Sequence, residues 1–206
     1  MNRNAMLKPL FTAAVLSCSL ALAACSGETA PPSAPEEAPL AGATIGGAFT
    51  LVNSKGAPVE WSDFDGQFRI VYFGYAYCPD ICPLDVQHMM QGYKQFAAQK
   101  PELAREMQPI FITIDPERDT PAVVGEFASA FSDKLLGLTG TREQVAEAAR
   151  AFAVYYAKGE TSPGGGYLMD HSRAAYLMGR KGEPIALLPV DEGAGPVAAE
   201  LIRWTH

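Results

Sequence analysis

The sequence has few basic residues, few cysteines and few histidines. The first shortage argues against some classes of ligand, and the other two limit the residues that could carry out thiol or imidazole chemistry. With 16 Lys and Arg against 23 Asp and Glu, the chain carries a formal net charge of −7. An acidic surface argues against binding nucleic acid or anionic lipid by charge. Because the chain holds only four cysteines and three histidines, any thiol or imidazole chemistry must come from a small set of residues.

The longest apolar run lies at the N-terminus. Residues 1–24 combine two basic residues near the start, an apolar stretch from Leu10 to Leu22 and small residues before Cys25. This layout predicts a secretory signal rather than a membrane-spanning helix. The ending Leu-Ala-Ala-Cys25 resembles a bacterial lipobox. An ordinary signal peptide or an uncleaved anchor is the alternative, and all three place the domain outside the cytoplasm.

The lipobox predicts that Cys25 is lipidated and anchors the protein to a membrane of the bacterial periplasm. Loss of residues 1–24, which contain two basic residues, no acidic residue and Cys18, moves the net charge from −7 to −9. Residues 25–47 are rich in Pro, Ala, Gly and Glu and are expected to form a disordered tether. Residues 48–206 then form one domain, long enough for a hydrophobic core without disulfide support.

Buried-strand and helical patterns alternate along this domain. We expect strands at residues 49–52, around 59, and at 70–75, 109–114, 135–138, 174–178 and 185–189, and helices at 84–99, 120–131, 141–152 and 196–204. This order predicts an α/β, thioredoxin-like fold with a central, mostly parallel sheet, helices on both faces and a β-hairpin near the C-terminus.

Two cysteines lie in the turn Cys78-Pro-Asp-Ile-Cys82-Pro83, between a predicted strand and a predicted helix. The positive end of the helix dipole favours thiolate over thiol at this place. At a spacing of four residues on a helix, the two Cβ atoms lie about 5–6 Å apart, which is longer than a relaxed disulfide prefers. A disulfide is possible, but the separation suits two thiolates that bind one ion.

A third ligand is most readily a histidine. His206 ends the chain, and His88 lies more than one helical turn beyond Cys82, where an exposed position is expected. His171 precedes the strand at 174–178, and in a thioredoxin-like sheet the loop entering that strand lies beside the cysteine turn. The alternative is a loop histidine bonded to its neighbour Asp170. Two thiolates and one imidazole suit copper, as Cu⁺ or Cu²⁺, and zinc can also use them.

Four aspartates lie near these residues in the sequence. Asp115 and Asp119 belong to an Asp-Pro-Glu-Arg-Asp segment after the second buried strand. On one interpretation Asp119 and Thr120 help to start the next helix and Arg118 pairs with a carboxylate. On the other, this acidic loop supports the cysteine turn or shapes a partner surface. Asp80, between the cysteines, and Asp170 are candidate outer-shell hydrogen-bond acceptors.

Four motifs in order make the sequence similar to the Sco (SenC) family of copper-binding, thioredoxin-fold proteins. They are Tyr72-Phe-Gly-Tyr75 leading into Cys78-Pro-Asp-Ile-Cys82-Pro83, Ile114-Asp-Pro-Glu-Arg-Asp-Thr120, Leu136-Gly-Leu-Thr-Gly140 and Asp170-His171-Ser172. The resemblance implies that Cys78, Cys82 and His171 bind copper. It also implies that the protein loads the CuA site of cytochrome c oxidase, reduces the disulfide of that site, or does both.

The resemblance implies that the CuA-bearing oxidase subunit is the partner, alongside other periplasmic copper chaperones or thiol-disulfide proteins. On the residues alone, a thiol-disulfide oxidoreductase that reduces protein disulfides, or a redox or copper sensor, stays open. An oxidoreductase of this fold would need Cys78 and Cys82 but not His171, and would normally face the thiols with a cis-proline. No proline stands at that place, so a copper metallochaperone is the favoured interpretation.

Overall fold

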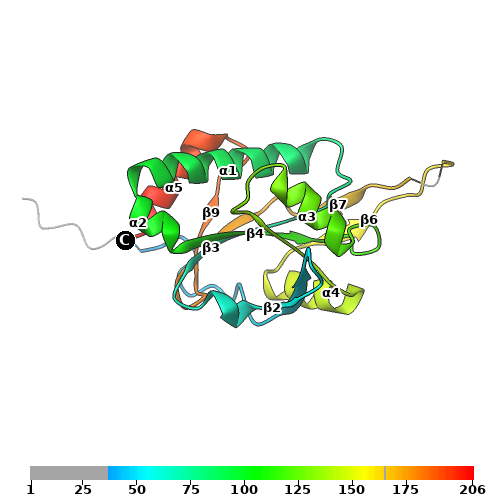
Figure 1. Ribbon diagram of the computed structural model, residues 1–206, viewed down its shortest axis with the longest axis horizontal. Coiled ribbons are helices and arrows are strands. Elements are labelled where there is room, and N and C mark those ends of the chain that lie inside the picture. Colours follow the sequence, from blue (N-terminus) through cyan, green and yellow to red (C-terminus); the bar gives the residue numbers. More distant parts are fainter. Residues whose placement is uncertain (1–36, 165) are drawn as a thin grey trace, which may run out of the picture. The chain divides into compact units, whose positions relative to one another are not determined.

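A computed structural model describes residues 37–164 and 166–206 (Figure 1). The predicted signal over residues 1–24, the lipidation of Cys25 and the start of the predicted tether lie outside the described residues. No helix in the described part of the chain is long and apolar enough to cross a membrane.

Seven strands form one sheet in the order β2-β1-β5-β4-β3-β8-β9. Their bounds are β1 (Thr50–Asn53), β2 (Pro58–Glu60), β3 (Phe68–Gly74), β4 (Met107–Thr113), β5 (Leu136–Thr139), β8 (Ala175–Met178) and β9 (Pro184–Leu188). The three central strands, β5, β4 and β3, are parallel, and the strands on either side pair antiparallel. Every residue of β3 is buried, as expected for a strand covered by helices on both faces.

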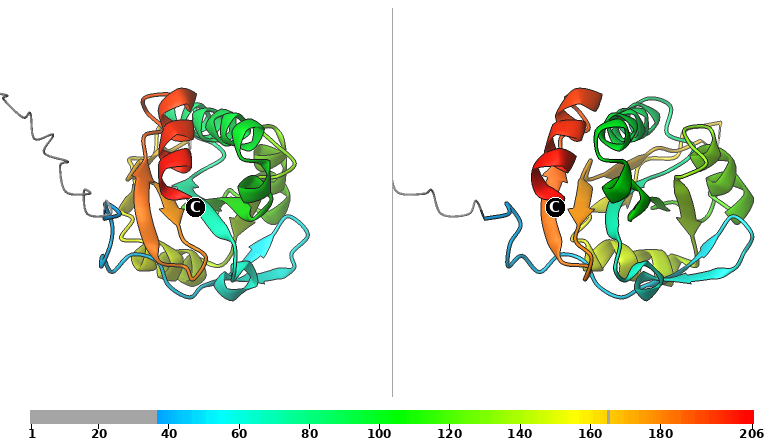
Figure 2. Two further views of the ribbon diagram at one scale, coloured as in Figure 1. Left: turned by 90° about the vertical axis from the view of Figure 1, so that its left-hand side faces the viewer. Right: turned by 60° about the vertical axis from the view of Figure 1, so that its left-hand side comes forward.

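Helices cover both faces of the sheet. They are α1 (Ile81–Gln99), α2 (Pro101–Arg105), α3 (Pro121–Ser129), α4 (Arg142–Ala151) and α5 (Ala194–Trp204). Helices α1 and α5 lie side by side on one face, and α4 lies on the opposite face (Figures 1 and 2). The α/β class with a thioredoxin-like arrangement and a C-terminal hairpin, β8–β9, is confirmed.

Side-chain caps explain where two of the helices begin. The Thr120 hydroxyl accepts a hydrogen bond from the backbone N–H of Val123, with proline at the first helical position of α3. Thr141 and Gln144 form the capping box that starts α4. Both starts follow from the sequence, because each cap is a contact between residues three positions apart.

Three short elements were not predicted: α2, a 3₁₀ turn at Trp61–Phe64, and a second sheet of two strands. This second sheet pairs β6 (Tyr156–Lys158) with β7 (Met169–His171). Each of its strands has three residues, and a glycine-rich loop separates them, so the sequence carries no period to detect. We call β6, β7 and the loop between them the histidine hairpin.

Residues 37–47 differ from the predicted disordered tether. The N–H of Leu40 donates to the carbonyl of Ile185 at 3.0 Å, and the N–H of Gly46 donates to the carbonyl of Ala151 at 2.8 Å. Three apolar residues of this segment pack against the core: Ala38, Leu40 and Ile45. Isolated apolar residues among proline and glycine give no periodic pattern, which is why composition alone assigned them to the tether.

Candidate metal centre

The cysteine turn follows the carboxyl end of β3 and begins α1. The thiol of Cys82 is fully buried in the first turn of α1, whereas Cys78 is partly exposed. The N–H of Cys82 donates to the sulfur of Cys78 at 3.4 Å, and the N–H of Cys78 donates to the carbonyl of Tyr75 at 3.2 Å. Both cysteines are free thiols. The start of a 19-residue helix therefore directs an amide N–H at the more exposed sulfur.

The histidine hairpin brings His171 against the cysteine turn, although 89 residues separate it from Cys82. The Nε2 atom of His171 lies 3.2 Å from the sulfur of Cys82. Its Nδ1 atom lies 2.9 Å from the carbonyl oxygen of Ser172, and since a carbonyl can only accept, Nδ1 carries the proton. The lone pair of Nε2 therefore faces the sulfur, which is the tautomer that a metal ligand requires.

The environments of the two thiols differ. Burial opposes ionisation of Cys78, but hydrogen bonds from the N–H groups of Asp80 and Cys82, the Cys82 thiol and the Tyr75 hydroxyl lower the pKa of Cys78 below its ordinary value. Burial, reinforced by the neighbouring Cys78 sulfur, raises the pKa of Cys82. Cys78 is therefore the thiol that ionises first. Burial also lowers the pKa of His171, which keeps the imidazole neutral and able to coordinate.

The donor atoms fit a soft metal ion after a small adjustment. As the side chains stand, no three His, Cys, Asp or Glu residues within 37–164 and 166–206 are arranged to hold a metal ion. Metal–sulfur and metal–nitrogen bonds of about 2.3 and 2.0 Å would hold the Cys82 sulfur and the His171 Nε2 atom about 3.5 Å apart. The observed 3.2 Å is a direct contact between the two donors. A slight separation of these two donors would admit the ion between them.

An ion pair between buried Asp85 and exposed Arg173, which the sequence did not predict, lies close to these donors. Asp85, fully buried on α1, accepts hydrogen bonds from Arg173 at 2.7 and 3.0 Å and from the Tyr72 hydroxyl at 2.9 Å. The ring of His171 packs edge-on against the rings of Tyr72 and Tyr75, with centroids 6.4 and 6.1 Å apart. Asp85 thus joins α1 to the residue two positions after His171.

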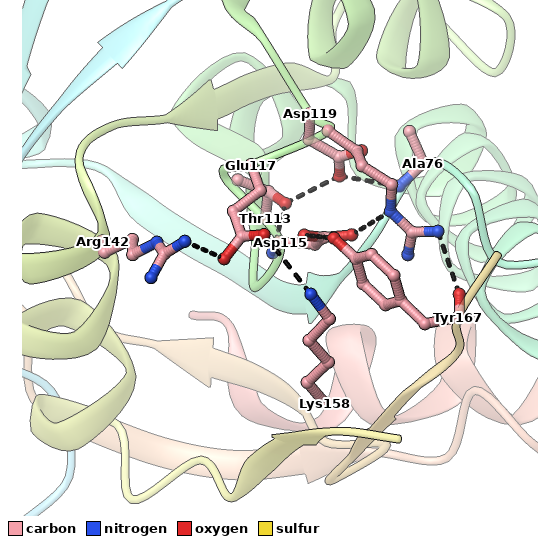
Figure 3. Close-up of polar contacts among 9 residues, drawn as sticks. Ala76, Thr113, Asp115, Glu117, Asp119, Arg142, Lys158 and Tyr167 are labelled. Atoms are coloured by element: carbon pink, nitrogen blue, oxygen red, sulfur yellow. Dashed lines mark hydrogen bonds and ion pairs between the residues drawn. The ribbon is translucent and has the colours of Figure 1, made fainter. Parts of the chain in front are cut away.

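The four predicted aspartates separate into two groups. Asp80 and Asp170 are exposed, and Asp80 does not cap α1 with its side chain. Asp170 points away from the cysteines, because neighbouring side chains on a strand face opposite sides. Asp115 and Asp119 are buried and contact other polar groups near the site (Figure 3).

The other histidine on α1 lies away from the site. His88 is half-buried rather than exposed as predicted, because its Nδ1–H donates to the carbonyl of Val190 at 2.7 Å. Among the functional residues that the sequence did not single out, Arg173 carried a weak signal as a charged residue next to His171 and before a buried strand. Asp85 carried none, because a polar residue on a helix usually faces solvent.

Comparison with known proteins gives consistent matches. The family model described as SCO1/SenC matches residues 37–206. "Protein SCO2 homolog, mitochondrial" of Mus musculus is 43% identical over 136 residues, covering 66% of this chain and 52% of that protein. "Protein SenC" of Rhodobacter capsulatus is 42% identical over 142 residues, covering 68% of this chain and 62% of that protein. The chain spans little more than half the length of these relatives.

Solved structures match over a larger share of their own length. Arabidopsis thaliana ScoI with copper bound is 33% identical, with a TM-score of 0.71, covering 77% of this chain and 96% of that one. Bradyrhizobium japonicum ScoI with copper bound is 32% identical, with a TM-score of 0.69, covering 78% and 99%. Homologous structures have thus been solved with copper bound.

Proposed function

The chain belongs to the SCO1/SenC family, and from this premise we propose that it is a copper metallochaperone that binds copper through Cys78, Cys82 and His171. One observation carries the proposal: the Nε2 lone pair of His171 lies 3.2 Å from the Cys82 sulfur. Two sulfurs and one imidazole nitrogen are a soft donor set suited to copper.

The copper ion is cargo. The protonation states of the two thiols and of the imidazole favour its coordination. Hydrogen bonds that lower the pKa of Cys78 favour its ionisation as the first thiolate. Coordination of copper would then displace the proton of Cys82, whose pKa is raised by burial. The hydrogen bond from Nδ1 to the Ser172 carbonyl holds the imidazole in the coordinating tautomer. Oxidation of the two cysteines to a disulfide would remove two donors, so the redox state controls binding.

An anaerobic titration with Cu⁺ of the reduced chain, in which Cys18 and Cys25 are replaced by serine, tests the proposal. One tightly bound copper per chain is expected, and His171→Ala, which removes a ligand, should weaken binding by more than the roughly 10- to 100-fold that loss of an outer-shell partner costs. His206→Ala is the matched control, because it removes an exposed imidazole at the end of the chain. Equal affinity in the parent and in His171→Ala would contradict the three-donor site.

We further propose that the recipient is the CuA site of a cytochrome c oxidase subunit, and that the protein works in the bacterial periplasm, anchored by lipidated Cys25. The family membership supports the recipient, and the lipobox-like ending before Cys25 supports the location. Mass spectrometry of the chain recovered from bacterial membranes tests the anchor. A diacylglyceryl group on Cys25 is expected, and an unmodified thiol at this residue would contradict it.

A thiol-disulfide reductase is the second candidate, favoured by the low pKa of Cys78 beside a second free thiol. The Cys78 thiolate would attack a target disulfide and form a mixed disulfide. Cys82 would then attack Cys78, release the reduced target and leave a Cys78–Cys82 disulfide. This reaction would depend on both cysteines, and its rate in His171→Ala would equal that of the parent.

A further inference from the structure

The position of His171 is not set by the main sheet. The histidine hairpin is a separate two-stranded sheet, and no ladder hydrogen bond joins it to the seven strands among the described residues. The C-terminal side of His171 is held, because β8 begins four residues later and Arg173 pairs with buried Asp85. The N-terminal side leads into a loop that contains Gly159, Gly164 and Gly166, a composition that provides little order of its own.

Two tyrosines hold this N-terminal side: Tyr75 shares a hydrogen bond with the backbone of Met169, and Tyr167 makes the larger set of contacts. The Tyr167 hydroxyl donates to Asp115 Oδ1 at 2.8 Å, and the Tyr167 carbonyl accepts from Arg118 Nη1 at 2.9 Å. The guanidinium carbon of Arg118 lies 3.6 Å from the centroid of the Tyr167 ring, and Arg118 also pairs with Asp115. Figure 3 marks the hydrogen bonds and the ion pair among these contacts with dashed lines around Asp115 and Tyr167. We call Asp115, Arg118 and Tyr167 the Arg118 clasp.

The clasp has further support from Lys158 on β6. Its ammonium nitrogen lies 3.9 Å from the centroid of the Tyr167 ring and 3.5 Å from a carboxylate oxygen of Glu117, which also pairs with Arg142 (Figure 3). Strand β6, through Lys158, and the end of the loop before β7, through Tyr167, are therefore joined to residues 115–118. A guanidinium suits this position better than an ammonium, because it can stack on a ring and donate from its edge at once.

The same loop also holds the cysteine turn. Asp119, fully buried, accepts hydrogen bonds from the N–H of Ala76 at 2.8 Å and from the Thr113 hydroxyl at 2.7 Å. Ala76 lies two residues before Cys78. A five-residue loop, 115–119, thus contacts the backbone before the cysteines at one end and the residue four positions before His171 at the other.

Because this loop contacts the segment that leads into the cysteine turn and the segment that leads into His171, we propose that the Arg118 clasp positions His171 against the two cysteines. The three clasp residues are positioning residues that hold no metal themselves. The inference rests on the proposed copper site and assigns a role to the Asp-Pro-Glu-Arg-Asp segment. Residues that orient a metal ligand typically change the metal affinity by 10- to 100-fold when replaced.

A double-mutant cycle separates positioning from general support of the fold. Tyr167→Phe removes the hydroxyl that bonds Asp115 but keeps the ring on Arg118. In the reduced full-length chain, competition with a chromophoric Cu⁺ chelator should show about a tenfold loss of affinity. In the His171→Ala background, the same change should cause no further loss. Tyr155→Phe is the matched control, because the Tyr155 ring is exposed, and its affinity should equal that of the parent.

Two results of the cycle would overturn the proposal. If Tyr167→Phe lowers the Cu⁺ affinity equally with and without His171, the clasp has only a general structural role. If Tyr167→Phe does not lower the Cu⁺ affinity, the clasp does not position His171. If His171→Ala binds copper as tightly as the parent, the proposed function fails. A measurement without metal then tests separately whether the clasp positions His171. In the reduced apo chain, the nuclear Overhauser effect between the His171 ring and the Cys82 β protons should weaken in Tyr167→Phe. An unchanged effect would overturn the positioning role without reference to copper.

Discussion

At the scale of single residues, the surroundings of the two cysteines give their thiols different pKa values. Cys78 sits in the turn with an amide N–H directed at its sulfur, whereas Cys82 is enclosed by the core. The same four-residue spacing in an open helix would give two similar thiols. The difference in pKa therefore comes from which sulfur receives backbone hydrogen bonds and which one loses water.

This asymmetry predicts the alkylation of single-cysteine variants by iodoacetamide, which reacts with the thiolate. Cys78, in Cys82→Ser, should react with a pH midpoint below the ordinary thiol value of 9.0. Cys82, in Cys78→Ser, should react with a midpoint above it. Rates measured by mass spectrometry from pH 5 to pH 10 should give the midpoint of Cys78, whereas the rate of Cys82 should still be rising at pH 10. The same midpoint for both thiols would contradict the assignment.

Asp119 predicts a pH dependence of stability. Burial raises its pKa above 3.8, although hydrogen bonds from Thr113 and Ala76 oppose this shift, and its Oδ1 atom has no protein partner among the described residues. Because the folded state holds this proton more tightly than the unfolded chain, the stabilisation is complete below pH 3.8 and is lost as pH rises through the higher folded pKa.

Urea denaturation of the parent and Asp119→Asn at several pH values between 3.5 and 7 measures this effect. The difference in free energy of unfolding, parent minus variant, should fall as pH rises. A difference that is constant with pH would show that the carboxyl of Asp119 has an ordinary pKa.

At the scale of helices and strands, features that depend on contacts between residues close in sequence could be predicted. Features that depend on particular contacts between distant residues could not. The capped helix starts at Thr120 and Thr141 and the buried strands β3 and β4 were predictable, because caps and apolar runs are local patterns. The proximity of His171 to the cysteine turn followed from topology. The partners that hold it did not, since Asp85 and Tyr167 meet residues 88 and 52 positions away. Such pairs leave no local signal in one sequence.

The packing of α1 on α5 gives a prediction at this scale. A Cβ atom on Gly92 would lie 2.5 Å from Val197 Cγ1 and 2.9 Å from the Ala194 carbonyl oxygen. Gly92→Ala should therefore lower the free energy of unfolding by about 1–2 kcal/mol, even though alanine is the better helix former by about 1 kcal/mol. Gln91→Ala, at an exposed neighbouring position, should change it by less than about 0.5 kcal/mol. A variant as stable as the parent in urea denaturation would mean that α5 moves aside without cost.

At the scale of the whole domain, the compact unit is larger than its apolar patterning suggests. Residues 37–47 add no strand or helix, yet they bond to the ends of β9 and α4 and cover part of the core. The family model likewise matches from residue 37. Among the described residues, the compact unit thus includes the eleven residues before the predicted boundary at residue 48.

Truncation tests this boundary. A chain that begins at residue 48 should have a free energy of unfolding about 2 kcal/mol lower than one that begins at residue 37, because it loses two backbone hydrogen bonds and the burial of Leu40 and Ile45. Urea denaturation of both chains measures the difference. Equal midpoints would show that this segment contributes nothing to stability.

The separation of the histidine hairpin from the seven-stranded sheet has a kinetic consequence. Since no ladder hydrogen bond has to break among the described strands, the hairpin can open as a local unit at a lower free energy than global unfolding. Cys78 and Cys82 would stay in place, because they belong to the β3–α1 turn. The residence time of the cargo would then follow the opening rate of one hairpin, and a recipient that offers its own ligand would capture the ion during such an opening.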